Sequence, residues 1–189
     1  MVIPPLAEKM EQRKGDIQLI EEARNGDMTA FRTLVERHEA RVAGVVKGIL
    51  GDTPESADVG QEVFIRLFES LEKFRGDASL STYVTRIAIN LSLNESKKRK
   101  RKFKLFGPLK EGENTQAEES ATDLKEMLYH ELQQLDPEFQ AVVTLRMIEG
   151  YSIQETAAVL EIPVGTVMSR LYRAQKKLKQ VIARKEGYE

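Results

Sequence analysis

Cationic side chains recur at helical intervals near the end of the chain. Positions 162–185 hold seven arginines and lysines and no acidic residue. At about 100° per residue, one stripe of this segment is apolar, and the stripe beside it is polar and mostly basic. The polar stripe contains Thr166, Arg170, Arg173, Lys177 and Arg184. Because arginine can read guanine and lysine can neutralise phosphate, the pattern favours nucleic-acid binding over a merely solvated helix face.

A short helix and a tight turn precede this basic segment. The sequence "SIQETAAVL" predicts a helix over 152–160 with Ser152 as its cap, and only "EIP" separates it from the next helix. Helix, turn and helix form the motif whose second helix enters the DNA major groove. The expected DNA contacts are Val164, Gly165, Thr166, Met168, Ser169, Arg170, Arg173, Lys176 and Lys177. The alternative is a helical hairpin that only packs against its neighbours.

A second polar row lies in the first half of the chain. It comprises Tyr83, Arg86, Asn90 and Asn94, and it leads into "KKRKRKFK" at 97–104, where seven of eight residues are basic. A ring, a guanidinium group and amides on a basic helix suit single-stranded nucleic acid, since bases stack and cations follow the backbone. The small residues of "RGDASLS" at 75–81 predict a loop that could surround an extruded base. The alternatives are that Tyr83 is a core aromatic and that the basic run is a solvated helix end.

Few residues could catalyse a reaction. Asp58 and Glu62 could form a carboxylate pair, but no histidine, nucleophile or metal-ligand cluster accompanies them. A protein-docking or solvated face, shared with Gln61 and Arg66, is favoured instead. His38 falls on the apolar face of its predicted helix and is expected to be packed. The chain has no cysteine, which excludes disulfides, zinc thiolate sites and cysteine nucleophiles, and we expect no cofactor, no metal and no enzymatic activity.

Length and composition place the chain among ordinary globular proteins. Its 189 residues, of which 41% are hydrophobic and 31% charged, suffice for one domain or two small ones. The net charge of −1 conceals a basic run at 97–104 and an acidic one at 111–126. No apolar run of about 7–15 residues begins the chain, and none approaches the ~18 residues of a membrane helix. We expect a soluble cytoplasmic protein without membrane insertion.

Helices must position the polar residues of the first half. An apolar helical face runs to Ile49, and Gly51 is expected to end that helix. Thr53-Pro54 suits an N-cap followed by the first residue of the next helix. A further helix is expected from about Thr82 into the basic run.

The second half begins after a linker. Residues 107–123 contain almost no large apolar side chain, which indicates a flexible segment. Asp136-Pro137 predicts another helix start, and Gly150 predicts its end. Because strand signals are weak, we predict an all-α chain of two small helical domains. Its parts are a tail at 1–15, a first domain at 16–104, a flexible acidic linker at 105–125 and a helix-turn-helix domain at 126–185.

In this order and across this linker, the two sets of residues resemble the extracytoplasmic-function (ECF) group of the sigma-70 family of bacterial RNA polymerase sigma factors. The resemblance covers roughly 16–182. "DVGQEVFIRLF" resembles the polymerase-docking helix of region 2, and "FRGDASLSTYVTRIAINL" resembles its segment that opens the −10 element. "IEGYSIQETAAVLEIPVGTVMSRLYRAQKKL" resembles the region 4 helix-turn-helix that reads the −35 element. The joint match is more specific than any of its parts.

The resemblance implies a promoter-specificity subunit that catalyses no reaction itself. It implies binding to the β′ and β subunits of core RNA polymerase through Asp58, Gln61, Glu62, Phe64 and Arg66. It implies that the second domain reads the −35 duplex and that the first captures a flipped base of the single-stranded −10 element. The implied −10 contacts are Arg75, Gly76, Asp77, Ser79, Thr82, Tyr83, Arg86, Asn90, Asn94, Lys97 and Lys98. An anti-sigma factor that buries these surfaces is the further partner that the family implies.

The chain departs from the family pattern at four positions. Tyr83 stands where tryptophan is frequent, Thr156 where an apolar residue is usual, Glu161 where glycine is common, and Met168 where lysine or arginine is frequent. Two other functions fit parts of the sequence. A helix-turn-helix regulator does not need "DVGQEVF", "FRGD" and a basic helix together, and a nucleic-acid-processing enzyme needs the catalytic cluster that the sequence lacks.

Overall fold

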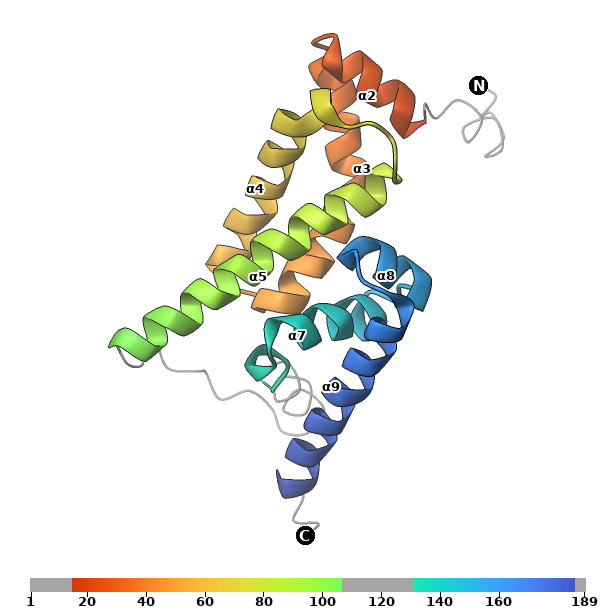
Figure 1. The fold of residues 1–189 in the computed structure, drawn as a ribbon. Coiled ribbons are helices and arrows are strands. Elements are labelled where there is room, and N and C mark those ends of the chain that lie inside the picture. Colours follow the sequence, from red (N-terminus) through yellow and green to blue (C-terminus); the bar gives the residue numbers. More distant parts are fainter. Residues whose placement is uncertain (1–14, 107–130, 186–189) are drawn as a thin grey trace, which may run out of the picture.

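The computed structural model describes residues 15–106 and 131–185, and every regular element within these ranges is helical (Figure 1). The N-terminal half contains α2 (Asp16–Arg24), α3 (Met28–Leu50), α4 (Pro54–Ser70), the 3-10 segment η1 (Leu71–Lys73) and α5 (Leu80–Phe106). The C-terminal half contains α7 (Pro137–Val143), the π-helical segment η2 (Thr144–Ile148), α8 (Ile153–Leu160) and α9 (Val164–Lys185). The all-α prediction is confirmed for these residues. Most of the predicted tail and linker lies outside them.

Helix α3 forms the centre of the N-terminal half. Asp27 caps its start, because the carboxylate accepts the backbone N–H groups of Thr29 at 2.8 Å and Ala30 at 3.2 Å. Gly51 follows its end with a φ of 79°, a conformation that glycine adopts without steric cost, and so confirms the predicted stop. The predicted apolar face is buried and includes Leu34, His38, Val42, Val45, Val46 and Ile49.

Helices α4 and α5 pack on α3. Thr53 precedes α4 in an extended conformation and Pro54 opens it, as predicted. Helix α5 begins at Leu80, slightly before the expected Thr82, because the hydroxyl of Ser79 accepts the N–H of Thr82 at 3.1 Å and caps the helix. The side chains that these helices bury include Val63, Leu67, Val84, Ala88 and Ile89.

Helices α7 and α9 form the body of the C-terminal half. Asp136 and Pro137 occupy the predicted N-cap and first position of α7. The helix then widens into η2, where the N–H of Glu149 bonds the carbonyl of Thr144 at 2.9 Å, and Gly150 follows with a φ of 71°. The widening was not predicted. A small core joins α7 to α9 and consists of Leu132, Leu135, Phe139, Val143 and Ala174.

The two halves pack against each other. Ala141, Leu145 and Val159 of the C-terminal half belong to the same buried cluster as the core residues of α2 to α5. Helix α8 lies beside α5, and η2 lies against α3 (Figure 1). The sequence indicated two domains but gave no sign of this contact between them.

In the ranges given above, no group of three or more His, Cys, Asp or Glu side chains is placed to hold a metal ion. His38 is packed, as predicted, with 5% of its surface exposed and its Nε2 3.1 Å from Oδ2 of Asp16. No helix in the described part of the chain is long and apolar enough to cross a membrane.

Candidate nucleic-acid interfaces

Helices α8 and α9 form the predicted helix-turn-helix. Ser152 begins α8 with a reciprocal capping box: its hydroxyl accepts the N–H of Glu155 at 3.1 Å, and its own N–H donates to the Glu155 carboxylate at 2.7 Å. Glu161 ends α8 in the left-handed region with a φ of 54°. The carbonyl of Pro163 then accepts the N–H groups of Thr166 and Val167 at the start of α9. These local signals fix the direction in which α9 leaves the turn.

Helix α9 is anchored along one side and exposed along the opposite side. The predicted apolar stripe is buried or partly buried at Val167, Leu171, Ala174 and Leu178. The exposed face contains Gly165, Met168, Ser169, Tyr172, Arg173 and Lys176. Tyr172 was not among the predicted contacts, although the residue is 68% exposed. Its position in the helical repeat, between those of Met168 and Ser169, would have allowed its exposure to be predicted. The side chains of Val181 and Arg184 lie outside the described residues.

Two cations of the predicted stripe turn toward α7 instead. Arg170 forms an ion pair with Glu138 at 2.8 Å, and Lys177 forms one with Asp136 at 2.8 Å. The ammonium group of Lys177 also lies 4.8 Å from the ring centre of Phe139. Its hydrogen bond to Asp136 is the main reason that the pKa of that carboxyl falls below its ordinary value. Arg170 and Lys177 therefore flank the exposed face of α9 and are oriented by acidic residues of α7.

The ring of Tyr83 lines a small cavity near the start of α5. The ring centres of Tyr83 and Phe74 are 5.1 Å apart, so one side of the tyrosine packs within the protein. The cavity of about 320 Å³ beside it is lined by Arg66, Glu69, Ser70, Lys73, Tyr83 and Ile87. The ring of Tyr83 is therefore packed against Phe74 on one side and also borders an open space.

The loop between η1 and α5 is held at both ends. Arg24 donates hydrogen bonds to the carbonyls of Leu71 and Phe74, which fixes the start of the loop. At the other end, Ser79 caps α5 and its hydroxyl lies 2.9 Å from that of Thr82. The predicted contacts Ser79 and Thr82 are therefore engaged with each other. The loop residues Arg75, Gly76 and Asp77 are exposed.

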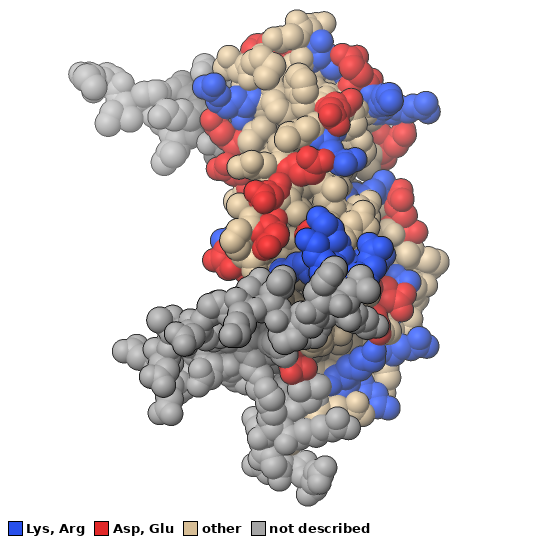
Figure 2. Space-filling view, turned by 90° about the vertical axis from the view of Figure 1, so that its left-hand side faces the viewer, with Lys and Arg blue, Asp and Glu red and all other residues tan. Residues whose placement is uncertain are grey.

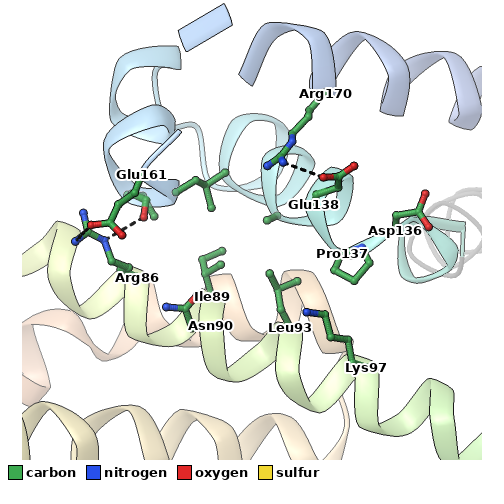
Figure 3. Close-up of a pocket in the computed structure, with 13 residues that line it drawn as sticks. Arg86, Ile89, Asn90, Leu93, Lys97, Asp136, Pro137, Glu138, Glu161 and Arg170 are labelled. Atoms are coloured by element: carbon green, nitrogen blue, oxygen red, sulfur yellow. Dashed lines mark hydrogen bonds and ion pairs between the residues drawn. The ribbon is translucent and has the colours of Figure 1, made fainter. Parts of the chain in front are cut away.

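Helix α5 presents a polar row on its surface, but one member points toward the other half. Asn90, Asn94, Lys97 and Lys98 are exposed, and Lys98 pairs with Glu95 at 3.1 Å. Arg86 instead reaches the end of α8 and forms an ion pair with Glu161 at 2.8 Å (Figure 3). Figure 2 shows lysine and arginine side chains at several places on one face of the molecule, with one group near the middle of the view and acidic side chains beside it.

The residues implied in polymerase docking lie on α4. Asp58 and Gln61 are exposed, and Arg66 pairs with Glu62 at 2.8 Å across one turn. Phe64 differs from the other predicted contacts, because it is partly buried against the core. Two apolar side chains that were not predicted contacts are exposed on the same helix: Ile65 at 53% and Phe68 at 46%.

Two family descriptions match the chain. The model of Sigma-70 region 2 matches residues 34–102, and that of Sigma-70, region 4 matches residues 125–178. The first match contains α4 and the polar row of α5, and the second contains the helix-turn-helix. Each candidate interface therefore lies within its own matched region.

Individual proteins are similar over nearly the whole chain. The ECF RNA polymerase sigma-E factor of Escherichia coli (strain K12) is 33% identical over 182 residues, covering 88% of this chain and 94% of the relative. The RNA polymerase sigma-H factor of Pseudomonas aeruginosa is 31% identical over 186 residues, covering 92% and 96%. A solved structure of CnrH in complex with the cytosolic domain of CnrY is similar with a TM-score of 0.65 and 26% identity, covering 89% of this chain and 97% of that one.

Proposed function

The chain belongs to the ECF group of the sigma-70 family, and from this premise we propose that it is a promoter-specificity subunit of bacterial RNA polymerase. The observation that carries the proposal is the presence of region 2 and region 4 in this order on one chain. A protein with both regions has one surface for each promoter element. It directs the polymerase to a start site and leaves the chemistry to that enzyme. We place its action in the cytoplasm, where transcription occurs.

The helix-turn-helix is the proposed reader of the −35 duplex. The N-terminal part of a recognition helix meets base edges in the major groove. In this chain that part carries Val164, Gly165, Thr166, Met168 and Ser169. Arg170 is proposed to contact a base, while Arg173, Lys176 and Lys177 lie further along and suit phosphates. The exposure of Tyr172 supports adding it to this set.

The start of α5 is the proposed site of −10 recognition. A flipped base needs a pocket and an aromatic or apolar surface on which to stack. The cavity beside Tyr83 and the exposed loop residues Arg75, Gly76 and Asp77 supply such a surface. Ser79 and Thr82 position the loop end, and the exposed cations Lys97 and Lys98 lie along the same helix. The proposed partners of Arg86, Asn90 and Asn94 are the neighbouring nucleotides of the single strand.

The exposed face of α4 is the proposed docking surface for core polymerase, through its β′ and β subunits. Protein interfaces combine an apolar centre with a polar rim. Exposed Ile65 and Phe68 can supply the apolar part, and Asp58, Gln61, Glu62 and Arg66 can supply the polar part. Because Phe64 packs inward, we assign it the role of holding α4 in place.

A protein inhibitor is the remaining proposed partner. The similar structure of CnrH was determined with the cytosolic domain of CnrY bound to it. We propose by this likeness that an anti-sigma factor binds this chain and covers its polymerase-binding and DNA-binding surfaces. No cofactor or metal enters the proposed function.

The −10 proposal is tested by changing the ring of Tyr83. The substitution Tyr83→Leu keeps an apolar side chain beside Phe74 but removes the stacking surface. Base–aromatic stacking contributes about 1–3 kcal/mol per base, so we expect open promoter to fall on the order of tenfold. Permanganate reactivity of −10 thymines measures the opening, and co-migration with core polymerase measures binding. Tyr83→Phe is the matched control and should open the promoter normally. Loss of polymerase binding in Tyr83→Leu would assign Tyr83 a packing role instead.

A further inference from the structure

The C-terminal half packs against a part of α3 where two glycines carry no side chain. Gly44 and Gly48 lie one turn apart on that helix. A Cβ built on Gly48 would lie 2.6 Å from Cγ2 of Thr144, and one built on Gly44 would lie 2.6 Å from a carboxylate oxygen of Glu149. No ordinary side chain packs so closely. Glycine at position 48 therefore allows η2 to approach the α3 backbone, whereas the neighbour of Gly44 is the end of the flexible Glu149 side chain.

The same contact completes the hydrogen bonding at the end of α3. The last carbonyl groups of a helix have no partner within the helix. Thr144 donates from Oγ1 to the carbonyl of Gly48 at 3.3 Å, and Gln140 donates from Nε2 to the carbonyl of Ile49 at 2.7 Å. Both donor side chains are fully buried. A buried polar group without a hydrogen-bond partner is energetically unfavourable. These two bonds join the two halves, so they form only while the halves are packed together.

Arg86 forms a second connection, between α5 and the end of α8 (Figure 3). Its guanidinium group donates to the carbonyls of Ala158 at 2.8 Å and Val159 at 3.2 Å. A cation at this position complements the negative end of the α8 dipole. The ion pair of Arg86 with Glu161, at 2.8 Å, adds a third contact from the same side chain.

The backbone conformation of Glu161 indicates that its carboxylate makes a specific interaction. Among the described residues it is the one non-glycine residue with a positive φ, at 54°. This conformation suits glycine, because a Cβ is crowded there. A glycine could end α8 equally well but could not bind Arg86. The ion pair with Arg86 is thus a physical reason for a glutamate at this turn.

The packed arrangement places residues proposed for different promoter elements around one cavity. The cavity has a volume of about 460 Å³, and its lining includes Arg86, Asn90, Lys97 and Arg170 (Figure 3). The −10 and −35 elements are about 25 base pairs apart, or about 85 Å along B-DNA at ~3.4 Å per base pair. Side chains that share one cavity cannot reach two sites at that separation. The closed form therefore cannot read both elements at once.

We propose that the contact between the two halves is autoinhibitory and that Arg86 and Glu161 form its latch. This inference rests on the proposed function and adds a regulation that requires no second protein. In the free protein, α8 holds Arg86 away from single-stranded DNA, and the close packing of η2 on Gly48 keeps the halves together. The separation of the halves releases Arg86 for the −10 strand and allows α9 to reach the −35 duplex.

Two substitutions loosen the contact in independent ways. Glu161→Gly removes the carboxylate while suiting the left-handed backbone, so it weakens the latch without weakening the turn. Gly48→Val adds a branched side chain that clashes with Thr144. The controls are Asp52→Asn, which breaks the 3.0 Å ion pair with Lys47 inside the N-terminal half, and Gly60→Ala on α4, where an added Cβ meets nothing within 4 Å.

The distance between the halves is measured in the full chain. The sequence has no cysteine, so Glu36→Cys and Lys179→Cys allow one spin label on exposed positions of α3 and α9. We expect Glu161→Gly and Gly48→Val to shift the distance distribution to longer values and the two controls to leave it unchanged. An unchanged distribution in Glu161→Gly overturns the latch, whether or not Gly48→Val folds.

A second measurement tests the occlusion itself. We expect Glu161→Gly without polymerase to bind a short fluorescein-labelled single strand at least several-fold tighter than the unsubstituted protein, because the competent fraction rises. A longer distance without tighter DNA binding would overturn the autoinhibitory role. Failure of the proposed function would appear differently, as absence of promoter-specific transcripts from core polymerase and the unsubstituted chain.

Discussion

Arg170 and Arg173 lie three positions apart on α9 and have different surroundings. Arg170 is 26% exposed in its side chain and is oriented by Glu138, whereas Arg173 lies on the exposed face. A guanidinium group held by a carboxylate has lost part of its freedom before DNA arrives. It therefore suits the directional hydrogen bonds of base reading better than a cation in open solvent, which suits phosphate.

The first prediction separates base reading from phosphate binding on α9. We expect Arg170→Ala to weaken −35 duplex binding by about 1–3 kcal/mol and to relax the preference at one base pair. Lys177→Ala should weaken all duplexes evenly and reduce the salt slope by about one unit. Fluorescence anisotropy across a salt series, with single-substituted duplexes, measures both effects. Equal losses on every duplex for the two variants would contradict this assignment.

The second prediction concerns the buried His38. Desolvation lowers the pKa of His38 below its ordinary 6.5 despite the attraction of Asp16, with Arg41 and Arg37 contributing smaller lowering effects. The unfolded chain then binds the proton more readily than the folded one. The contribution to stability is complete above pH 6.5 and is lost as the pH falls toward the lowered pKa of the folded state.

Urea unfolding of His38→Gln tests this sign. Glutamine does not titrate, so the loss of unfolding free energy between about pH 7 and about pH 5 should be smaller than in the unsubstituted protein. Parallel pH dependence of the two proteins would mean that His38 does not contribute. The packed state of His38 could be predicted from the sequence, because its position repeats with the apolar residues of α3. The contact of His38 with Asp16, which lies 22 positions away, could not be predicted from the sequence.

Helix ends are the elements that local sequence specified best. Ser152 and Glu155 form the capping box of α8, and Gly51 and Gly150 follow helix ends with positive φ. These signals act within a few residues of the backbone they control. The widening of η2 has no comparable local signal. It coincides with the surface that packs on α3, whose residues lie far away in the sequence.

The third prediction tests the cap of α8. Ser152→Ala removes the acceptor for the Glu155 N–H and should destabilise the C-terminal half by about 1 kcal/mol. Binding to the −35 duplex should weaken in parallel, because α8 sets the direction of α9. Thr33→Ala is the matched control, since its hydroxyl bonds the carbonyl of Thr29 within α3 and caps nothing. Denaturant unfolding and duplex anisotropy provide the readouts, and an equal effect of both substitutions on duplex binding would argue against the capping role.

At the scale of the whole molecule, the sequence allowed the two regions to be predicted but not their contact. Periodicity identifies the apolar side of each helix, and the linker composition separates the halves. The contact between them depends on the fit of Gly48 to Thr144 and on hydrogen bonds between residues about 70 to 100 positions apart, such as the bond from Arg86 to Ala158. The apolar positions Ala141 and Leu145 fit equally a domain core and an interface. The buried cluster contains residues of both halves, so these two positions belong to the interface.

Transcription by core RNA polymerase on fragmented genomic DNA, with start sites mapped, tests the central claim most directly. With the purified chain added, we predict new start sites that share one sequence near −35 and one near −10 and that are absent with core enzyme alone. Arg170→Ala should reduce the yield of these transcripts. With this variant the yield should no longer depend on which base occupies one −35 position. If the chain neither co-migrates with core polymerase nor yields start sites beyond those of core enzyme alone, the assignment as a promoter-specificity subunit is contradicted.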